Sequence, residues 1–395
     1  MTLPKVTIVI SGGNLGGLLA TGDGVTGIIL ACHSAAPSGM TLGEAKRYTS
    51  LDAVKADGLD ADFDTDNTTN AFRQVMELYS VTSNAVVWIM PVVNTEEMED
   101  ICDSALTPCY LKNLVEQSGY EVKVVGVCRK PDAGYTPTVL KGLDDDVIAA
   151  IAKAQAYCET LAAQGSPIAV ILEGRLLTAV ANLEDLKTHT DNYVGVVICG
   201  TSDTDKSASV GLVLGKVAGL PVQRNIGRVK DGDLGIAAAY TSDGAIVDNQ
   251  DMETIHDLGY ITIRKFRGKS GYYYTDDPLA TATTDDFNTL SRRRTINKAI
   301  LIAYNTYVNE INEEVKITTD GKIDPAFAKY FQGVVQAQLD TLMTSEGNVS
   351  SAVVFVNVDQ NIISTNKLAV SIRLVPVGQA KEIEVTIGFS NPATT

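Results

Sequence analysis

The sequence predicts a multidomain protein that combines an α/β region with an α+β region and ends in strand-forming arms. Between residues 85 and 220, continuous apolar runs of strand length alternate with helical stretches, which is typical of a sheet buried on both faces. Between residues 261 and 376, two amphipathic helices precede runs with period-two alternation, which indicates an α+β domain. A chain of 395 residues also exceeds the roughly 250 to 300 residues that one hydrophobic core supports.

Composition indicates a globular protein and disfavours two classes of partner. Hydrophobic residues make up 45% and charged residues 20% of the chain, and the formal net charge is -16. An acidic chain lacks the excess of Lys and Arg that attracts nucleic acid or an anionic membrane. The sequence has no window of 18 apolar residues and no basic start followed by a long apolar core. Neither a transmembrane helix nor a secretory signal is therefore predicted.

Cysteines and histidines give no sign of a metal centre or a catalytic site. The six cysteines are scattered without a C-x-x-C pair, and His33, His189 and His256 lie in separate segments. This arrangement predicts no zinc site, no disulfide framework and no catalytic triad, and no cofactor is expected. Cys128 and Cys199 end apolar runs and are expected to be buried.

Residues 1–26 are expected to form an N-terminal strand arm and a glycine-rich linker. Val6, Ile8 and Ile10 occupy one face of a predicted strand. The following segment, Ser11 to Gly17, lacks G-x-G-x-x-G spacing and is not followed by a helical pattern. A connector is therefore favoured over a dinucleotide or phosphate site, which needs a helix N-terminus.

Residues 27–260 are expected to form the α/β region. An acidic run that starts at Asp60 has Thr65 and Ala71 where a calcium loop needs glycine and glutamate. No nucleophile elbow or zinc-protease motif occurs, and Gly268–Ser270 lacks the earlier glycine of a phosphate loop. An enzyme acting on a sugar or a nucleotide in this region remains the alternative function. The predicted strands are Gly27–Cys32, Ala85–Met90, Val122–Cys128, Ile168–Leu172 and Tyr193–Cys199.

Residues 261–376 are expected to form the α+β domain. An aromatic strand and turn, Gly271–Asp277, is expected to pack on neighbouring strands. A capping pattern at Thr281–Asp286 predicts the start of a long helix. Three adjacent arginines at 292–294 lie in this helix, and a solvated face with local ion pairs is their simplest interpretation.

The C-terminal third is predicted to hold a second helix and three strands. An Asp324 cap followed by Pro325 predicts the helix start. The stretch Ala352–Phe389 then contains three runs of period-two alternation, of which the last, Glu382–Phe389, is the most regular. Residues 377–395 are therefore expected to form a C-terminal strand arm that pairs with its own sheet or with that of a neighbour.

Short motifs spread over most of the chain carry a resemblance to a known family. They are Pro4, Val6 and Ile8, the run Asp23–Val25, the strand and turn Gly271–Asp277, the arginines that open the long helix, Val356–Val358 and Gln360–Ile362. In their order they resemble the contractile tail sheath proteins of bacteriophages and related contractile injection machines. The resemblance covers the C-terminal third most fully.

The resemblance implies a subunit that surrounds a tail tube as stacked rings and contracts to drive the tube through a cell envelope. It implies an inner α+β assembly domain built from the N- and C-terminal segments, with an inserted α/β outer domain. The implied partners are further copies of the chain in a helical sheath, the tail tube protein, and baseplate and tail terminator proteins. It also implies a virion tail or injection particle assembled in the bacterial cytoplasm, without nucleic acid, membrane insertion, catalysis or a cofactor.

The resemblance and the alternation together assign two sets of residues. The first set forms arms that are exchanged between subunits: Val6, Ile8, Ile10, Ile383, Val385, Ile387 and Phe389. The second set is expected to face the tube: Arg292, Arg293, Arg294 and Lys298. Two other functions remain open, namely the α/β enzyme and a self-assembling shell protein that does not contract.

Overall fold

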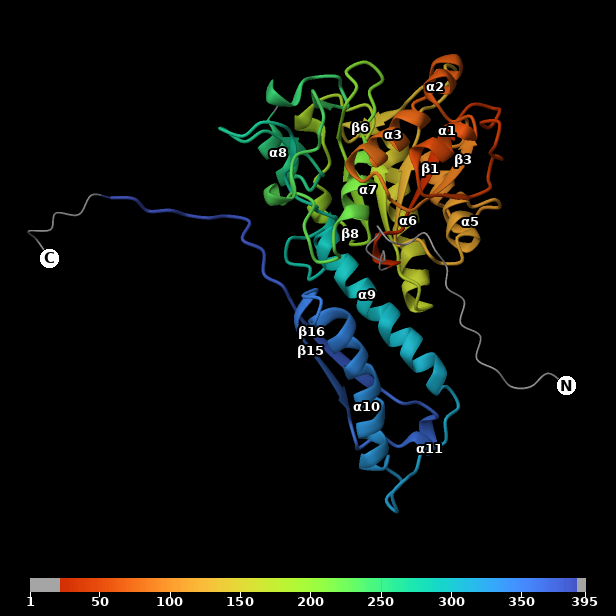
Figure 1. Ribbon diagram of the computed structural model, residues 1–395, viewed down its shortest axis with the longest axis vertical. Helices are drawn as coiled ribbons and strands as arrows, with labels where there is room; N and C mark the ends of the chain where they lie inside the picture. Colours follow the sequence, from red (N-terminus) through yellow and green to blue (C-terminus); the bar gives the residue numbers. More distant parts are fainter. Residues whose placement is uncertain (1–21, 250, 389–395) are drawn as a thin grey trace, which may run out of the picture. The chain divides into compact units, whose positions relative to one another are not determined.

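The computed structural model describes residues 22–249 and 251–388. The expected N-terminal strand and Phe389 lie outside these residues. The chain divides into two compact units, Met1–Asn305 and Thr306–Thr395, which run from red to cyan and from cyan to blue in Figure 1. Helices and strands occur in both units, which confirms the predicted mixture of α and β structure.

The first unit is built on a six-stranded sheet in the order β2-β3-β1-β4-β7-β9. Its strands are β1 (Thr26–Cys32), β2 (Lys46–Tyr48), β3 (Val87–Val93), β4 (Val124–Cys128), β7 (Ala169–Glu173) and β9 (Val194–Val197). Neighbours pair in parallel except β2, which is antiparallel to β3. Every residue of β1 and β4 is buried, so these strands read as continuous apolar runs. The five strands predicted from such runs are confirmed.

Helices cover both faces of this sheet (Figure 1). The helices from the start of the described chain to the end of the first unit are η1 (Gly22–Gly24), α1 (Leu51–Ala56), α2 (Ala61–Asn67), α3 (Ala71–Val81), α4 (Met98–Cys102), α5 (Tyr110–Gln117), α6 (Asp145–Ala163), α7 (Val210–Gly219), α8 (Met252–Asp257) and α9 (Leu290–Tyr307), which ends just beyond it. A Cβ at Gly126 would meet Leu214 of α7, and one at Gly27 would meet Leu114 of α5. Gly27 pairs with Val125, the neighbour of Gly126, so the two glycines face opposite sides.

Three glycines allow α7 to approach α3 closely. Gly211, Gly215 and Gly219 are spaced by four residues and therefore lie on one side of α7. A Cβ at Gly211 would lie 1.8 Å from the carbonyl oxygen of Gln74, and one at Gly215 would lie 2.6 Å from that of Leu78. Both carbonyls belong to the backbone of α3, which cannot move aside as a side chain can. The two helices cross at a distance that only glycine permits.

Short strand pairs also belong to the first unit, and the core of this unit reaches beyond the expected domain boundary at residue 261. They are β5 (Val139–Leu140), β6 (Leu143–Asp144), β8 (Thr190–Asp191), β10 (Cys199–Gly200), β11 (Tyr240–Thr241), β12 (Ile263–Arg264), β13 (Tyr273–Tyr274) and β14 (Ala280–Thr281). Tyr272 and Tyr274 are buried in this core, as expected for packed aromatic residues. Leu279 and Leu290 belong to the same core. The segment expected to open the C-terminal domain therefore packs in the first unit.

Helix α9 begins later than predicted. The N–H of Leu290 donates to the carbonyl of Asp277 (2.8 Å), and the N–H of Ser291 donates to its carboxylate (2.9 Å). Asp277 thus satisfies amides that a helix start leaves open. The predicted start at Thr281–Asp286 was wrong, because the residue that caps the helix comes from a more distant part of the sequence.

The second unit contains α10 (Pro325–Leu339), a π-turn (Asp340–Thr344), α11 (Ile362–Thr365), β15 (Val349–Val356) and β16 (Val370–Pro376). Asp324 caps α10 by accepting a hydrogen bond from the N–H of Ala326 (2.8 Å), and Pro325 is the first helical residue, as predicted. The strands β15 and β16 form an antiparallel sheet of two strands. Helix α10 packs on β15.

Alternation along β15 separates a covered face from an open one. Ala352, Val354 and Val356 are buried, whereas Val353 and Phe355 are 56% and 58% exposed. Phe331 of α10 shares a small core with Val356. After β16, residues 377–388 continue without helix or strand assignment and are exposed. The second unit therefore presents an open sheet face and a solvent-exposed chain end.

Candidate functional site

Charged side chains gather at the carboxyl ends of the parallel strands. Arg129 follows β4 and Glu173 ends β7, and the uncharged Thr201 follows the short strand β10 that comes directly after β9. Ligands of α/β sheets bind at this edge. It is therefore the place where the alternative enzyme would have its active site.

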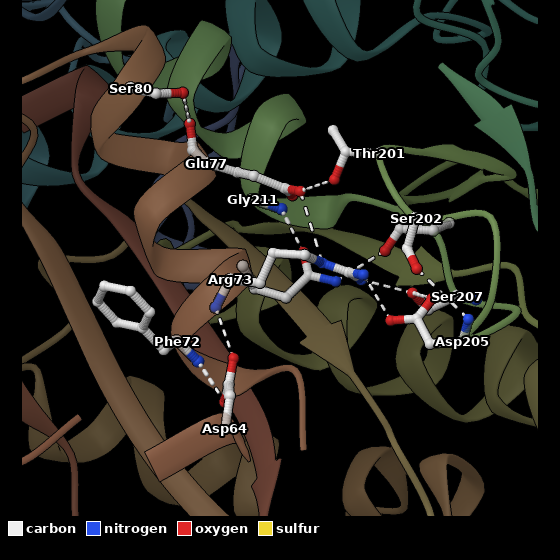
Figure 2. Close-up of polar contacts among 12 residues, drawn as sticks. Asp64, Phe72, Arg73, Glu77, Ser80, Thr201, Ser202, Asp205, Ser207 and Gly211 are labelled. Carbon is white, nitrogen blue, oxygen red and sulfur yellow. Dashed lines mark hydrogen bonds and ion pairs between the residues drawn. The ribbon is translucent and has the colours of Figure 1, made fainter. Parts of the chain in front are cut away.

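Arg73 and Glu77 of α3 connect that helix to the loop after β10. Figure 2 shows the Arg73 guanidinium pointing toward Asp205 and Ser207. Its two Nη atoms lie 2.5 Å from the Asp205 carboxylate and the Ser207 hydroxyl, and its Nε lies 3.6 Å from Glu77. The hydroxyl of Thr201 donates to Glu77. Burial raises the pKa of Glu77, although Arg73 opposes that shift. One cation thus ties a helix to a loop in a water-poor environment.

Glu173 holds two further loops to the sheet. Its carboxylate is fully buried and accepts hydrogen bonds from the backbone N–H groups of Arg129 (2.7 Å) and Ala208 (3.2 Å). Burial raises the pKa of Glu173 from 4.5 to about 7. A neighbouring pair, Arg129 and Asp146, lies 2.6 Å apart with side chains that are 1% and 3% exposed. Asp146 also accepts from the N–H of Met98 at the start of α4 (2.9 Å).

The bonding of this network indicates a structural role. Each of its charged side chains is occupied by an opposite charge or by a backbone N–H of the same chain. A shallow hollow elsewhere in the first unit is lined by Asp23, Lys123, Val222, Arg294, Asn297, Lys298 and Leu301, and none of these belongs to the network. In residues 22–249 and 251–388, no three His, Cys, Asp or Glu side chains are grouped to hold a metal ion. The same residues include no helix with the length and apolar character of a membrane span.

The C-terminal arm has the exposure expected of a strand that lacks a partner. Ile383, Val385 and Ile387 are 77%, 68% and 89% exposed. No strand is assigned between Val377 and Gly388. The alternation predicted a strand, and the single chain leaves it unpaired. Val6, Ile8, Ile10 and Phe389 lie outside the described residues, so exchange between subunits stays a prediction.

The arginines at 292–294 do not form a solvated face. Arg293 is 3% exposed and stacks on the rings of Tyr193 (3.7 Å) and Phe287 (4.3 Å). Its Nε donates to the carbonyl of Asn192 (3.0 Å). Only Arg292 of the three arginines is exposed, and its guanidinium donates to Asn288 (3.2 Å). Contact with a tube stays a prediction, and Arg292 is the arginine available for it in the single chain.

Arg294 and Lys298 instead hold the segment at which the described chain begins. Arg294 is 4% exposed and donates to the carbonyls of Val217 (3.1 Å) and Leu220 (3.0 Å), which end α7, and to that of Asp23 (3.3 Å). Lys298 lies 2.8 Å from the Asp23 carboxylate. A cation at a helix C-terminus is favourable because the last carbonyls lack intrahelical partners. These two residues therefore have a structural role within the first unit.

Comparison with known proteins identifies the family. A family model described as the DUF2586 N-terminal domain matches residues 3–278, and one described as the DUF2586 C-terminal domain matches residues 286–394. The chain belongs to the DUF2586 family. No curated protein matches this DUF2586 chain in sequence.

Solved structures share the fold of this DUF2586 chain along nearly its whole length. One is a chain of the anti-feeding prophage baseplate, determined with 6-fold symmetry, with a TM-score of 0.63, 13% identity, and coverage of 99% of this chain and 100% of that one. Another is a chain of the PVC sheath complex of an extracellular contractile injection system in its contracted state, with a TM-score of 0.60, 12% identity, and coverage of 100% and 99%. At these identities the likeness establishes the fold.

Sequence reasoning missed the buried charges of this DUF2586 chain. Arg129 and Glu173 each follow directly after an apolar run, and a charged residue in that position could have indicated a buried charge at the end of a strand. Arg73 and Glu77 have the spacing of an ion pair on one helix face. The partners Asp205 and Asp146 lie far away in the sequence, so the bonds themselves could not be read from it.

Proposed function

We propose that this chain is a structural subunit of a contractile sheath that polymerises around a tail tube and contracts to drive the tube through a cell envelope. The observation that carries the proposal is the exposed, alternating C-terminal arm beside a sheet of only two strands. A two-stranded sheet has two edges and is marginally stable alone, and an extended segment with alternating apolar residues is suited to complete it. The two structures of similar fold come from contractile systems, which supports the same function.

Burial of the arm in a neighbouring subunit would supply much of the assembly energy. The side chains of Ile383, Val385 and Ile387 are two thirds or more exposed, and each contributes about 1.5 to 3 kcal/mol on full burial. Scaled by the exposed fraction of each side chain, the three together give about 4 to 7 kcal/mol per arm as an upper bound. Ordering of the arm and loss of subunit freedom offset part of this. A single arm contact is therefore weak, and a lattice of many such contacts is strong.

The proposed partners are other copies of this chain, a tail tube protein, and baseplate and terminator proteins at the ends of the tube. The proposed location is a phage-like tail or injection particle. Arg292 is the proposed tube contact within the predicted set, because its side chain is exposed. The carboxylates of Glu173 and Asp146 are held by backbone N–H groups and by Arg129, and this supports a role without catalysis over the alternative of an α/β enzyme.

Deletion of Gly378–Thr395, examined by negative-stain electron microscopy with and without the tube protein, tests the proposal. The full chain is expected to form tubes or stacked rings, and the deletion variant is expected to remain a folded monomer. Normal assembly of the deletion variant would refute a role for the arm. Uniform small particles from the full chain together with its tube protein would refute the sheath function.

A subunit of a baseplate ring is the second candidate, because one chain of similar fold comes from a baseplate structure. The same micrographs separate the two candidates. A sheath subunit extends into tubes whose length grows with protein concentration, whereas a baseplate subunit stops at single rings.

A further inference from the structure

A glutamine side chain occupies one edge of the two-stranded sheet. The side-chain N–H of Gln336 in α10 donates to the carbonyl of Ala352 (2.9 Å), and its side-chain oxygen accepts from the N–H of Val354 (2.9 Å). The same amide nitrogen also donates to Asp340 (3.0 Å). A primary amide that pairs with a strand through both a donor and an acceptor makes the two hydrogen bonds that a peptide group of an added strand would make.

These two bonds show which way the backbone of β15 points. Residues two apart in a strand direct their N–H and C=O groups to the same side. Because Ala352 and Val354 both bond to Gln336, the backbone groups of these residues point away from β16. Leu374 and Ile372 of β16 lie opposite Ala352 and Val354. By the same alternation, the backbone N–H and C=O groups of Leu374 and Ile372 point away from β15.

The other edge of the sheet is open. By the alternation, Val370, Ile372 and Leu374 of β16 direct their backbone N–H and C=O groups outward, and no hydrogen bond from the described residues reaches these groups. Pro376 ends the strand and has no N–H to offer, which is typical of an edge strand. The open edge therefore runs from Val370 to Leu374.

The C-terminal arm matches this edge in both polarity and charge. Val370, Ile372 and Leu374 are half-buried and alternate with the exposed Ser371 and Arg373. In the arm, Ile383, Val385 and Ile387 alternate with Glu382, Glu384 and Thr386. A strand that places its apolar side beside that of β16 brings its glutamates to the side of Arg373, and opposite charges on neighbouring strands are favourable.

We infer that Gln336 blocks the edge of β15 as a mimic of a strand, and that the arm of a second copy therefore adds to β16 along Val370–Leu374. This inference rests on the proposed function, because it names the edge that strand exchange uses. Gln336 also protects the unassembled subunit, since an unguarded edge is a template for wrong pairing. The arm of the same chain is the competing occupant, because only five residues separate Pro376 from Glu382.

Cysteine cross-linking in the full-length chain, before and after assembly, tests the choice of edge. Glu384→Cys is combined with Arg373→Cys or Ser371→Cys on β16, and with Val353→Cys on β15 as the matched control on the same sheet face. The six native cysteines are buried and should not cross-link. Variants with only one introduced cysteine measure the background of disulfides formed by random collision. The expected result is a ladder of covalent multimers on a non-reducing gel for the two β16 pairs, and a yield for the β15 pair that does not exceed the background of the single variants.

The other outcomes overturn defined parts of the inference. A ladder from the Val353→Cys pair and not from the β16 pairs would place the arm on β15. A cross-link within one chain would make the arm its own subunit's third strand. If the micrographs show tubes but no β16 pair cross-links, the sheath function would stand and the edge of β16 would be rejected as the binding site of the arm. The two proposals can therefore fail separately.

Variants of Gln336 test its guarding role. Gln336→Ala removes both hydrogen bonds to β15, and the Glu384→Cys and Val353→Cys cross-link is expected to rise about fivefold or more from the loss of two hydrogen bonds of this class. Gln336→Glu keeps the acceptor for Val354 and loses the donor for Ala352, so an intermediate yield is expected. Circular dichroism checks that both variants fold. An unchanged yield in Gln336→Ala would reject the guarding role.

Discussion

The crossing of α3 and α7 predicts a large effect from one added methyl group. In Gly211→Ala the new Cβ would lie 1.8 Å from the Gln74 carbonyl oxygen, whereas ordinary contact begins at 3.4 Å. Helices α3 and α7 would have to separate by roughly 1.5 Å, and overpacking of this kind costs about 1 to 3 kcal/mol. The Gln74 side chain also bonds to the Gly211 N–H (2.9 Å) and to the Ala208 carbonyl (2.7 Å). Strain on these bonds adds about 1 kcal/mol each.

The expected net destabilisation of Gly211→Ala is about 2 to 4 kcal/mol, because alanine regains about 1 kcal/mol of helix propensity. Urea unfolding followed by fluorescence measures it in the first unit alone, since Trp88 in β3 is the single tryptophan of the chain. Gly333→Ala in α10 is the matched control, because a Cβ there has no neighbour within 4 Å. It should leave the Trp88 transition unchanged and stabilise α10. A Gly211→Ala midpoint equal to that of the wild type would refute the reasoning.

Three further predictions concern the buried charges and thiols. The pKa of Glu173 is about 7 in the folded chain and 4.5 when the side chain is exposed, so the folded state binds the proton more tightly than the unfolded state does. The free energy of unfolding should therefore fall as the pH rises from about 5 to 8. Glu173→Gln should flatten that slope in urea titrations of Trp88 fluorescence, and an unchanged slope would contradict the assignment. Arg129→Met leaves Asp146 buried without its cation and should lower the free energy of unfolding by about 3 to 5 kcal/mol. Lys265→Met breaks an exposed ion pair of the same 2.6 Å length and should lower it by less than about 1 kcal/mol. Equal losses in the two variants would argue against the role of burial. All six cysteines are buried, so a thiol reagent should modify none in the native chain and all six in denaturant, and a fast native reaction would count against the described core.

The sequence was sufficient for features that depend on local patterns. Continuous apolar runs predicted the five parallel strands of the large sheet, because a strand covered on both faces has no polar side. Asp324 and Pro325 predicted the start of α10, because a helix cap and its first residue are neighbours in the chain.

Features that depend on distant partners could not be predicted in this way. Three adjacent arginines suggested a solvated surface, yet Arg293 and Arg294 find aromatic rings and helix-end carbonyls that the sequence separates from them. The cap of α9 comes from Asp277, which the local pattern at Thr281–Asp286 concealed. The four-residue spacing of Gly211 and Gly215 places them on one side of a helix. The close approach that they permit could not be predicted, because it depends on which helix packs against that side.

The incomplete sheet of the second unit has a consequence for how many copies an assembly needs. Under the proposed exchange, the arm that is given and the edge that receives it are different parts of the same chain, so the contact is heterologous. One such contact between two copies leaves one arm and one edge unpaired, unless the two copies exchange arms reciprocally and close as a ring of two. A heterologous contact has only two saturated outcomes, a closed ring or an indefinite filament. The stoichiometry of the assembled particle is then set by the angle between successive copies, which the short segment between Pro376 and Glu382 controls.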